Sequence, residues 1–384
     1  MSYAPAPLPS PTYVTRPSLP PLEKFYPHLE EIWGSQILTN HGPKHQQLQE
    51  MLSSKLGAAQ VRLFCNGTQA LTLALQALDI KGEVLTTPFT FPATPHSIAL
   101  AGAMPVFCDV DPETLCISPK AIEDMIGPNT EAILGVHVYG IPCDVSAIEA
   151  IAAKHGLKII YDAAHAFMTE IHGTPIAEFG DATMFSFHAT KLFHTVEGGC
   201  LAFKDKNLAG KLDLLRNFGI LDEDTVSLVG TNAKMNELQA AMGVEMLHVV
   251  GKERAARAAI KQRYREVLEG IDGLLYLQPP IGVTDSLQYM AVRINPEQFG
   301  MHRDELYETL KAWNIFTRRY FHPLCSSFPF YGNARKSTLT AAEAAANEVL
   351  CLPLYGELGI ENVERIAEVI AFVQRRRQKK ILVA

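Results

Sequence analysis

The sequence predicts an α/β protein: a mostly parallel sheet of seven strands flanked by helices, followed by a smaller C-terminal α/β domain. Two observations support this fold class. Between residues 61 and 203, short apolar segments alternate with segments of helical periodicity, which is the pattern of parallel strands joined by crossover helices. After residue 205, a long helical stretch leads into a second, shorter series of strands and helices, and 384 residues suffice for two domains.

Each of the seven predicted strands is a short apolar segment. The strands are predicted at residues 61–65, 83–86, 105–109, 132–138, 158–162, 182–187 and 200–203. Helices are predicted at residues 44–56, 68–78, 95–101, 119–125 and 145–155. Because helices cover both faces of a parallel sheet, we expect ligand-binding loops at one of its edges.

The two ends of the chain differ from this central region. Seven prolines between residues 5 and 21 exclude a helix or a central strand there, and residues 1–12 are predicted to be a flexible tail. The helical stretch 236–268 contains the predicted boundary between a large domain, residues 13–252, and a small domain, residues 253–384. The small domain is predicted to hold strands at 288–294 and 315–318 and helices at 303–313, 341–349 and 362–374.

Composition excludes several classes of function. A net charge of −7 argues against a general nucleic-acid binder, which needs a basic face to neutralise phosphates. No apolar run is long enough to span a membrane, and the N-terminus lacks the pattern of a signal peptide. The seven cysteines are scattered without metal-ligand spacing, which indicates free thiols in a reducing compartment. We therefore expect a cytoplasmic protein with no metal site, no nucleic-acid partner and no membrane contact.

The stretch 181–199, DATMFSFHATKLFHTVEGG, carries the best candidates for chemistry. A predicted buried strand leads into Ser186 and Lys191, and a Gly-Gly pair follows. A lysine in a dry pocket has a lowered pKa and can form a Schiff base with an aldehyde. Ser186 could reach an anionic group on the same ligand. The alternative for Lys191 is an ordinary solvated lysine.

An anion site is the second candidate. Gly67 and Thr68 follow the first predicted strand and open a helix. A glycine allows close backbone approach, and a helix N-terminus favours a phosphate. An ordinary glycine turn with a helix cap is the alternative here.

These segments, taken together, resemble one family. The motif SFHATK at 186–191, followed by EGG at 197–199, resembles the pyridoxal-phosphate lysine motif of the DegT/DnrJ/EryC1/StrS sugar aminotransferases. The segments NGT at 66–68, PFTFPAT at 88–94, YDAAHA at 161–166 and NAKMNELQAA at 232–241 resemble further motifs of that family in the same order. The resemblance extends from residue 14 to the last predicted helix. It implies a type I, aspartate-aminotransferase-like fold.

The resemblance also implies pyridoxal 5′-phosphate (PLP) as the cofactor, and it assigns roles to particular residues. In catalysis it implies Lys191 as the cofactor-binding base, Asp162 at the pyridine nitrogen and His165 beside the phenolic oxygen. It implies that Phe91 stacks on the ring and that Gly67, Thr68 and Ser186 hold the phosphate. It implies that Asn232 reaches the phosphate of the neighbouring subunit, and therefore a homodimer with shared active sites. For Asp162 a helix N-cap, for His165 a structural histidine and for Phe91 a core aromatic are the alternatives.

The loop RRYFHPL at 318–324 and the segment HTVE at 194–197 resemble the branch that aminates deoxy-keto sugars on dTDP. Arg318, Arg319 and Tyr320 are therefore candidates for sugar-nucleotide binding, since guanidinium groups suit phosphate oxygens. A surface or structural role for one of the two arginines is the alternative. His194 and His322 stand where Asn and Tyr are more usual in the family, which leaves the substrate open.

The function implied by the resemblance is transfer of an amino group from glutamate to a nucleotide-linked keto sugar. The expected reaction converts dTDP-4-keto-6-deoxy-D-glucose to dTDP-4-amino-4,6-dideoxy-D-glucose, for O-antigen or other unusual glycans. A 3-keto-sugar aminotransferase is the first alternative. A PLP sugar dehydratase is another, although such enzymes typically replace the lysine with histidine, and a non-catalytic PLP-binding regulator is the third. The sequence leaves open whether the nucleotide is dTDP or UDP.

Overall fold

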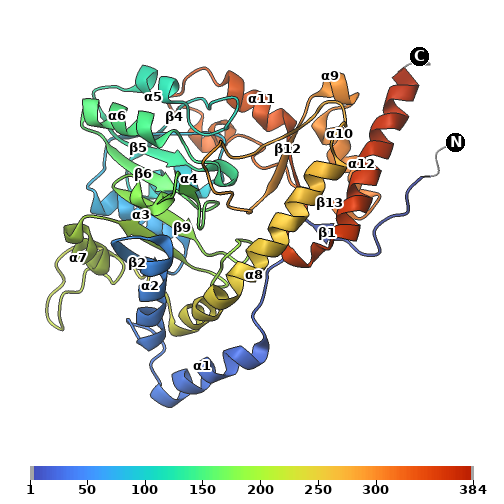
Figure 1. Ribbon diagram of the computed structural model, residues 1–384. Coiled ribbons are helices and arrows are strands. Elements are labelled where there is room, and N and C mark those ends of the chain that lie inside the picture. Colours follow the sequence, from blue (N-terminus) through green and yellow to red (C-terminus); the bar gives the residue numbers. More distant parts are fainter. Residues whose placement is uncertain (1–3, 382–384) are drawn as a thin grey trace.

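A seven-stranded sheet forms the centre of the large part of the molecule (Figure 1). The computed structural model describes residues 4–381. The strands are β2 Gln60–Phe64, β3 Glu83–Thr86, β4 Met104–Phe107, β5 Thr130–Val136, β6 Lys158–Asp162, β9 Ala182–Ser186 and β10 Gly199–Phe203. Their order is β2-β10-β9-β6-β5-β3-β4, and only β10 runs antiparallel to its neighbours. The predicted mostly parallel sheet is confirmed, with all seven strands within two residues of their predicted bounds.

Helices pack on both faces of this sheet. They are α2 Pro43–Leu56, α3 Gly67–Ala77, α4 Ala93–Leu100, α5 Pro119–Met125, α6 Val145–His155, α7 Lys206–Leu215 and the start of α8 Glu237–Val267. Alternate residues of β9 and β10 belong to different cores because side chains alternate along a strand. Met184 and Leu201 belong to the core that contains α3 and α7, whereas Phe185 and Cys200 belong to the core with α2 and α8.

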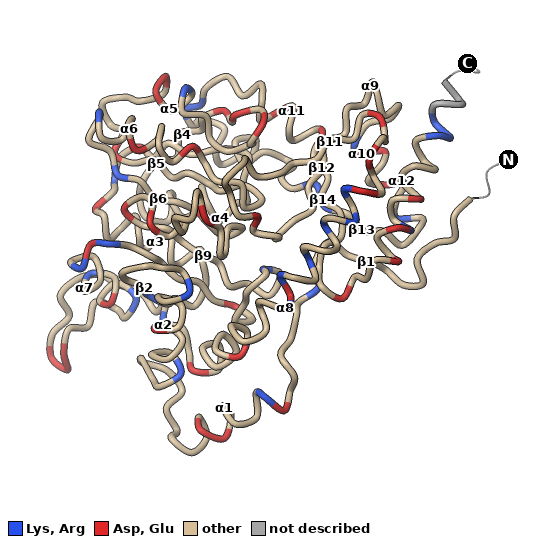
Figure 2. Tube along the Cα trace, viewed as in Figure 1, with Lys and Arg blue, Asp and Glu red and all other residues tan. Residues whose placement is uncertain are grey.

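A second, smaller sheet of three antiparallel strands lies beyond α8. Its strands are β11 Leu274–Tyr276, β12 Met290–Ile294 and β14 Val349–Leu352, with helices α9 Pro296–Phe299, α10 Arg303–Lys311, α11 Thr340–Glu348 and α12 Ile360–Ile381. Positions of both charge signs occur along α8 and α12 (Figure 2), and Arg263 of α8 pairs with Glu364 of α12 at 2.6 Å. Helix α8 is continuous, so the domain boundary within it stays a prediction.

Some details of this smaller part differ from the prediction. Strands β11 and β14 were not predicted; β14 follows α11 directly, with no glycine or proline to mark the change. Strand β13, Ile315–Phe316, was expected in the small domain, and it pairs in parallel with β1, Thr12–Tyr13, instead of joining the three-stranded sheet. Among residues 4–381, no helix combines the length and the apolar composition that a membrane crossing requires.

Residues 4–12 of the predicted flexible tail contact the C-terminal part of the chain; residues 1–3 lie outside the described part, and the flexibility of the tail stays a prediction. Leu8 is buried, and its backbone N–H donates to the carbonyl oxygen of Trp313 at 3.1 Å. The Asn314 side chain donates to the Leu8 carbonyl at 2.8 Å. Prolines remove N–H donors but leave carbonyl acceptors, and Trp313 Nε1 donates to the carbonyl oxygen of Pro5 at 3.0 Å. Helix α1, Leu22–Ser35, then leads to α2.

Candidate active site

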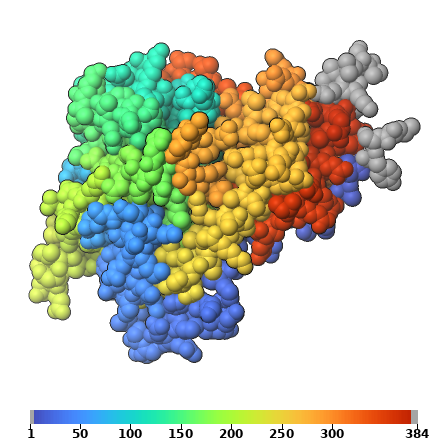
Figure 3. Space-filling model, viewed as in Figure 1, coloured from blue at the N-terminus to red at the C-terminus, as the bar shows by residue number. Residues whose placement is uncertain are grey.

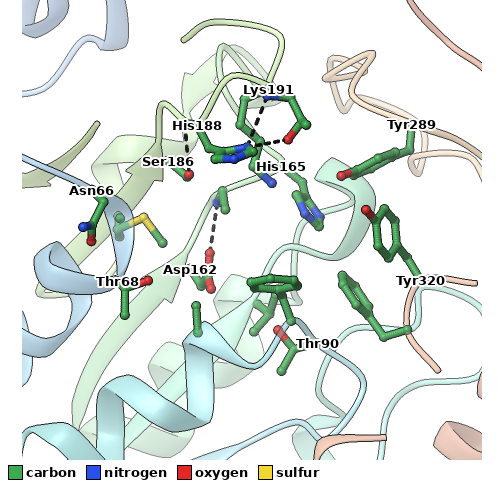
Figure 4. A pocket seen from close by; sticks show the side chains of 18 of the residues that line it. Asn66, Thr68, Thr90, Asp162, His165, Ser186, His188, Lys191, Tyr289 and Tyr320 are labelled. Atoms are coloured by element: carbon green, nitrogen blue, oxygen red, sulfur yellow. Dashed lines mark hydrogen bonds between the residues drawn. The ribbon is translucent and has the colours of Figure 1, made fainter. Parts of the chain in front are cut away.

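A cavity of about 270 Å³ opens at the carboxyl ends of β6 and β9 (Figure 4). Strands β6 and β9 are parallel neighbours, with Asp162 opposite Met184, so the residues that end them meet at one sheet edge. The cavity is lined by Asn66, Gly67, Thr68, Thr90, Phe91, Ala93, Val136, Asp162, Ala164, His165, Met184, Ser186, His188, Thr190, Lys191, Glu197, Tyr289, Tyr320 and Phe321.

Lys191 enters the cavity from a tight turn after β9. Its backbone N–H donates to the carbonyl oxygen of His188 at 2.8 Å, and the Thr190 N–H donates to His188 Nδ1 at 3.2 Å. Burial lowers the pKa of the Lys191 amine to about 8, and the negative charge of Asp162 opposes that shift. An amine with this pKa is present partly as the neutral nucleophile near neutral pH.

This lowered pKa gives a direct prediction for the cofactor-free protein. Only the deprotonated amine reacts with an acylating reagent, so labelling of Lys191 should rise with pH and reach half its maximum near pH 8. The measurement is labelling at a series of pH values, followed by peptide mapping. Half-maximal labelling near the ordinary lysine value of about 10.4 would contradict the dry environment described for this amine.

Asp162, the last residue of β6, is a buried carboxylate on the floor of the cavity. Thr94 Oγ1 donates to its Oδ2 at 2.8 Å, and the Ala164 N–H donates to its Oδ1 at 3.0 Å. Burial raises the pKa of this carboxyl, while the bonds from Ala164 and Thr94 and the charge of Lys191 act in the opposite direction. A carboxylate with unused lone pairs in a dry cavity is suited to a cationic N–H group of a ligand.

His165 is held in one tautomer by its surroundings. The backbone N–H of Tyr139 donates to His165 Nδ1 at 3.2 Å, so the ring proton of the neutral form lies on Nε2. Burial, together with the positive charge of Lys191, lowers the pKa of His165 well below its ordinary value. His165 is therefore neutral near pH 7 and presents an N–H donor. Its ring is parallel to that of Phe321, with centroids 5.9 Å apart.

The N-terminus of α3 forms the anion-binding side of the cavity. The Asn66 side chain accepts the Gln69 N–H at 2.9 Å and so caps the helix. A methyl group on Gly67 would lie 2.9 Å from Met184 Sδ and 3.2 Å from Ser186 Cβ, so a side chain would fill the space between this turn and β9. The helix N-terminus and the hydroxyls of Thr68 and Ser186 suit a phosphate.

These groups together define what the cavity can bind and do. It offers a nucleophilic amine, a neutral histidine donor, a buried carboxylate for a cation and a helix N-terminus for an anion. A planar, phosphorylated heterocycle with an aldehyde fits all four. The amine can in addition carry a proton to and from a bound substrate.

Comparison with known proteins identifies the family. The model of the DegT/DnrJ/EryC1/StrS aminotransferase family matches residues 22–371. The chain belongs to the DegT/DnrJ/EryC1/StrS aminotransferase family. The resemblance seen in the sequence motifs is thus confirmed over most of the chain.

Two relatives share one name. A dTDP-4-amino-4,6-dideoxy-D-glucose transaminase of Shigella dysenteriae is 44% identical over 361 residues, covering 94% of this chain and 98% of the relative. The protein of that name from Escherichia coli is 41% identical and covers 93% of this chain and 97% of its own length. Among solved structures, DesI, crystallised in the presence of its TDP-sugar product, matches with a TM-score of 0.94 and 34% identity, covering 98% of this chain and 96% of DesI. The predicted aminotransferase-like fold is confirmed.

Most of the residues that the family motifs single out line this one cavity. Those brought together there are Gly67, Thr68, Phe91, Asp162, His165, Ser186, Lys191 and Tyr320. Three others lie elsewhere. Asn232 is exposed and forms a β-bridge with Asn217. Arg318 is exposed, and Arg319 pairs with Asp304 at 3.0 Å and lies over the Tyr307 ring. Their roles in binding stay predictions.

Several residues of the site were not singled out from the sequence. Thr94 lies within a quoted motif but had no role assigned, and it is the hydrogen-bond donor to Asp162. Tyr139 and Tyr289 form part of the cavity surroundings from loops distant in sequence. A tyrosine in an apolar run gives no sign of such a role. The place of these residues in the site could be recognised only from the three-dimensional structure.

Proposed function

We propose that this family member is a PLP-dependent aminotransferase that moves an amino group from glutamate to a nucleotide-linked keto sugar. The favoured acceptor is dTDP-4-keto-6-deoxy-D-glucose, giving dTDP-4-amino-4,6-dideoxy-D-glucose. The observation that carries the proposal is the meeting of Lys191, Asp162 and His165 around an anion-binding helix terminus. The two dTDP-sugar transaminases at 41–44% identity support the acceptor.

The residues present fit PLP. Gly67, Thr68 and Ser186 would hold the phosphate, because Gly67 carries no side chain and leaves the N-terminus of α3 open to an anion. Asp162 would bind the pyridine N–H, and that charge pair would relieve the cost of burying the carboxylate. Bound in this way, PLP supplies an electron sink for the amino group's α-carbon.

The chain's own residues would then orient the cofactor and transfer the protons. Lys191 Nζ, with its lowered pKa, can take the proton from the α-carbon of the amino donor in the first half of the reaction and, in the second half, deliver a proton to the sugar carbon that receives the amino group. His165 Nε2–H would donate to the phenolic oxygen of the cofactor and fix its orientation. The aromatic rings of Tyr289, Tyr320 and Phe321 line the cavity, and their apolar faces would limit the entry of water.

A panel of keto-sugar nucleotides tests this function. The purified protein is incubated with PLP, glutamate and 4-keto or 3-keto sugars on dTDP or UDP, and the products are analysed by mass spectrometry. We expect the amine product with the 4-keto sugar on dTDP. A 3-keto-sugar transferase is the second candidate, since a UDP-N-acetyl-3-dehydro-glucosamine 3-aminotransferase of Acidithiobacillus ferrooxidans is 34% identical. Amination of the 3-keto sugars alone would favour it.

We also propose a homodimer in which Asn232 completes the phosphate site of the partner. Asn232 is exposed on the segment that follows α7, near Val226 and Val229, which are 68% and 94% exposed. Helix α1 projects as a separate lobe (Figure 3) and exposes the apolar Trp33. Exposed apolar groups of this kind are typical of a surface that a second subunit covers.

Mixing two inactive variants tests the shared site. In a mixed dimer of Lys191→Ala and Asn232→Ala chains, one site carries both defects and the other carries neither. Activity should therefore return on subunit exchange, to about a quarter of the wild-type value by random pairing in a symmetric dimer. Steady-state assays of the mixture check this, with each variant alone as the control. If Asn232→Ala alone is impaired and verified mixed dimers show no recovery, Asn232 acts within its own chain.

A further inference from the structure

Gln288 lies beside Lys191 although it belongs to the C-terminal part of the chain. It stands two residues before β12 and is buried. Its side-chain Oε1 accepts the backbone N–H of Leu192 at 2.8 Å, and its Nε2 donates to the carbonyl oxygen of Thr190 at 3.0 Å. These two backbone groups flank the lysine. One amide therefore pairs with the main chain on both sides of Lys191.

The segment that carries Gln288 is anchored to α8 by ionic and backbone contacts. Lys261 pairs with Asp285 at 2.6 Å, and Arg254 donates to the Asp285 carbonyl at 3.0 Å. The other carboxylate oxygen of Asp285 accepts the Leu287 N–H at 2.9 Å. The segment is thereby fixed to the long helix, which also packs against α2.

The same segment contacts the opposite side of the cavity. Ser286 Oγ donates to the carbonyl oxygen of Tyr139 at 3.1 Å, and the Tyr139 N–H is the donor to His165. The Tyr289 ring meets the His165 ring edge-on, with centroids 5.0 Å apart. Figure 4 shows Tyr289 beside His165 and Lys191 at the cavity. Residues 285–289 thus contact both the lysine turn and the histidine.

We propose that Gln288 is a positioning residue that fixes the backbone around Lys191 and so aims its amine at the reacting carbon. The role of Lys191 rests on the proposed function, whereas the two hydrogen bonds do not depend on it. Lys191 lies in the loop between β9 and β10 and has no strand partner of its own. Gln288 supplies the pairing that a neighbouring strand would give. The rate of proton transfer depends on the position of the Lys191 amine, because a misplacement of about 1 Å can cost about 10²-fold in rate.

Gln288→Met is the main variant, since methionine has nearly the same length and forms neither hydrogen bond. We expect kcat to fall by roughly 10-fold to 100-fold, with KM for the sugar nucleotide within about twofold, because Gln288 does not line the cavity. In the full-length protein, amide hydrogen exchange at Leu192 should become at least about tenfold faster, as expected when a protecting bond is lost. Gln374→Met is the matched control: Gln374 is also buried and donates to one backbone carbonyl, that of Asp272. It should change neither quantity.

The pH dependence of the activity of Gln288→Glu distinguishes a positioning role from a purely structural one. A protonated glutamic acid both accepts and donates and so mimics glutamine, whereas the carboxylate cannot donate to Thr190. The activity of this variant relative to wild type should therefore rise as pH falls. If Gln288→Met does not fold, this pH profile and the exchange of the Leu192 amide in wild type still decide.

Three results would overturn the proposal. They are wild-type kcat in Gln288→Met, a flat relative pH profile in Gln288→Glu, or a Leu192 amide that exchanges in the native wild-type protein as fast as exposed loop amides. Failure of the proposed function would look different. In that case no nitrogen transfer would be found, yet Leu192 exchange would still respond to Gln288→Met and not to Gln374→Met.

Discussion

Lys191→Ala should abolish amino transfer, with turnover reduced by about 10⁴-fold or more, since one substitution removes both the covalent attachment and the proton-transfer base. The fold should survive, because the side chain lines the cavity and, among residues 4–381, its amine takes part in none of the buried ion pairs. Steady-state assays with purified protein, accompanied by circular dichroism, check both statements.

Two controls accompany this variant. Lys154→Ala removes an exposed lysine that pairs with Glu123 at 2.6 Å on the surface, and such pairs contribute little, so its activity should stay at the wild-type level. Borohydride reduction of the wild-type holoenzyme, followed by peptide mapping, should place the cofactor on Lys191. Substantial turnover in Lys191→Ala, or label on another lysine, would refute the assignment.

Asp162→Asn should reduce turnover by about 10³-fold, of the size seen when one preorganised electrostatic partner is removed. The variant keeps the shape of the side chain, and its amide oxygen can still accept the Ala164 N–H. It loses the negative charge that would keep the pyridine nitrogen of PLP protonated, so the cofactor's capacity as an electron sink falls. Steady-state kinetics measure the effect.

Asp144→Asn is the matched control for Asp162. Asp144 caps α6 by accepting the Ala147 N–H at 3.0 Å, and asparagine caps a helix as well as aspartate does. Because the cap is kept and Asp144 does not line the cavity, this variant should retain its activity within about twofold. Near-normal turnover in Asp162→Asn would mean that a different carboxylate binds the cofactor.

The large sheet and most of the site could be predicted from local sequence. Each strand is a compact apolar segment, and Asp162 and Ser186 stand at the ends of two of them. Carboxyl ends of neighbouring parallel strands meet at one edge, so strand order along the chain already brings these residues together. Lys191 lies only five residues beyond Ser186.

Contacts between distant segments could not be predicted. Gln288 binds the backbone of Thr190 and Leu192 across about a hundred residues of sequence, and no local pattern distinguishes it from other glutamines. Arg319 was predicted as a candidate ligand for phosphate, and its pairing with Asp304 could not be predicted from the sequence. The burial of Leu8 could not be predicted either, because its proline-rich segment has no periodicity. Its backbone forms hydrogen bonds with Trp313 and Asn314.

The central claim, amino transfer from glutamate to a keto-sugar nucleotide, is tested most directly by isotope transfer. The wild-type protein with PLP is incubated with ¹⁵N-glutamate and dTDP-4-keto-6-deoxy-D-glucose, and the sugar nucleotide is analysed by mass spectrometry. We predict a dTDP-amino-dideoxy sugar that carries the ¹⁵N label, with release of 2-oxoglutarate, and no such product with Lys191→Ala. Unlabelled, unchanged sugar nucleotide in the presence of PLP-loaded wild-type protein would contradict the account.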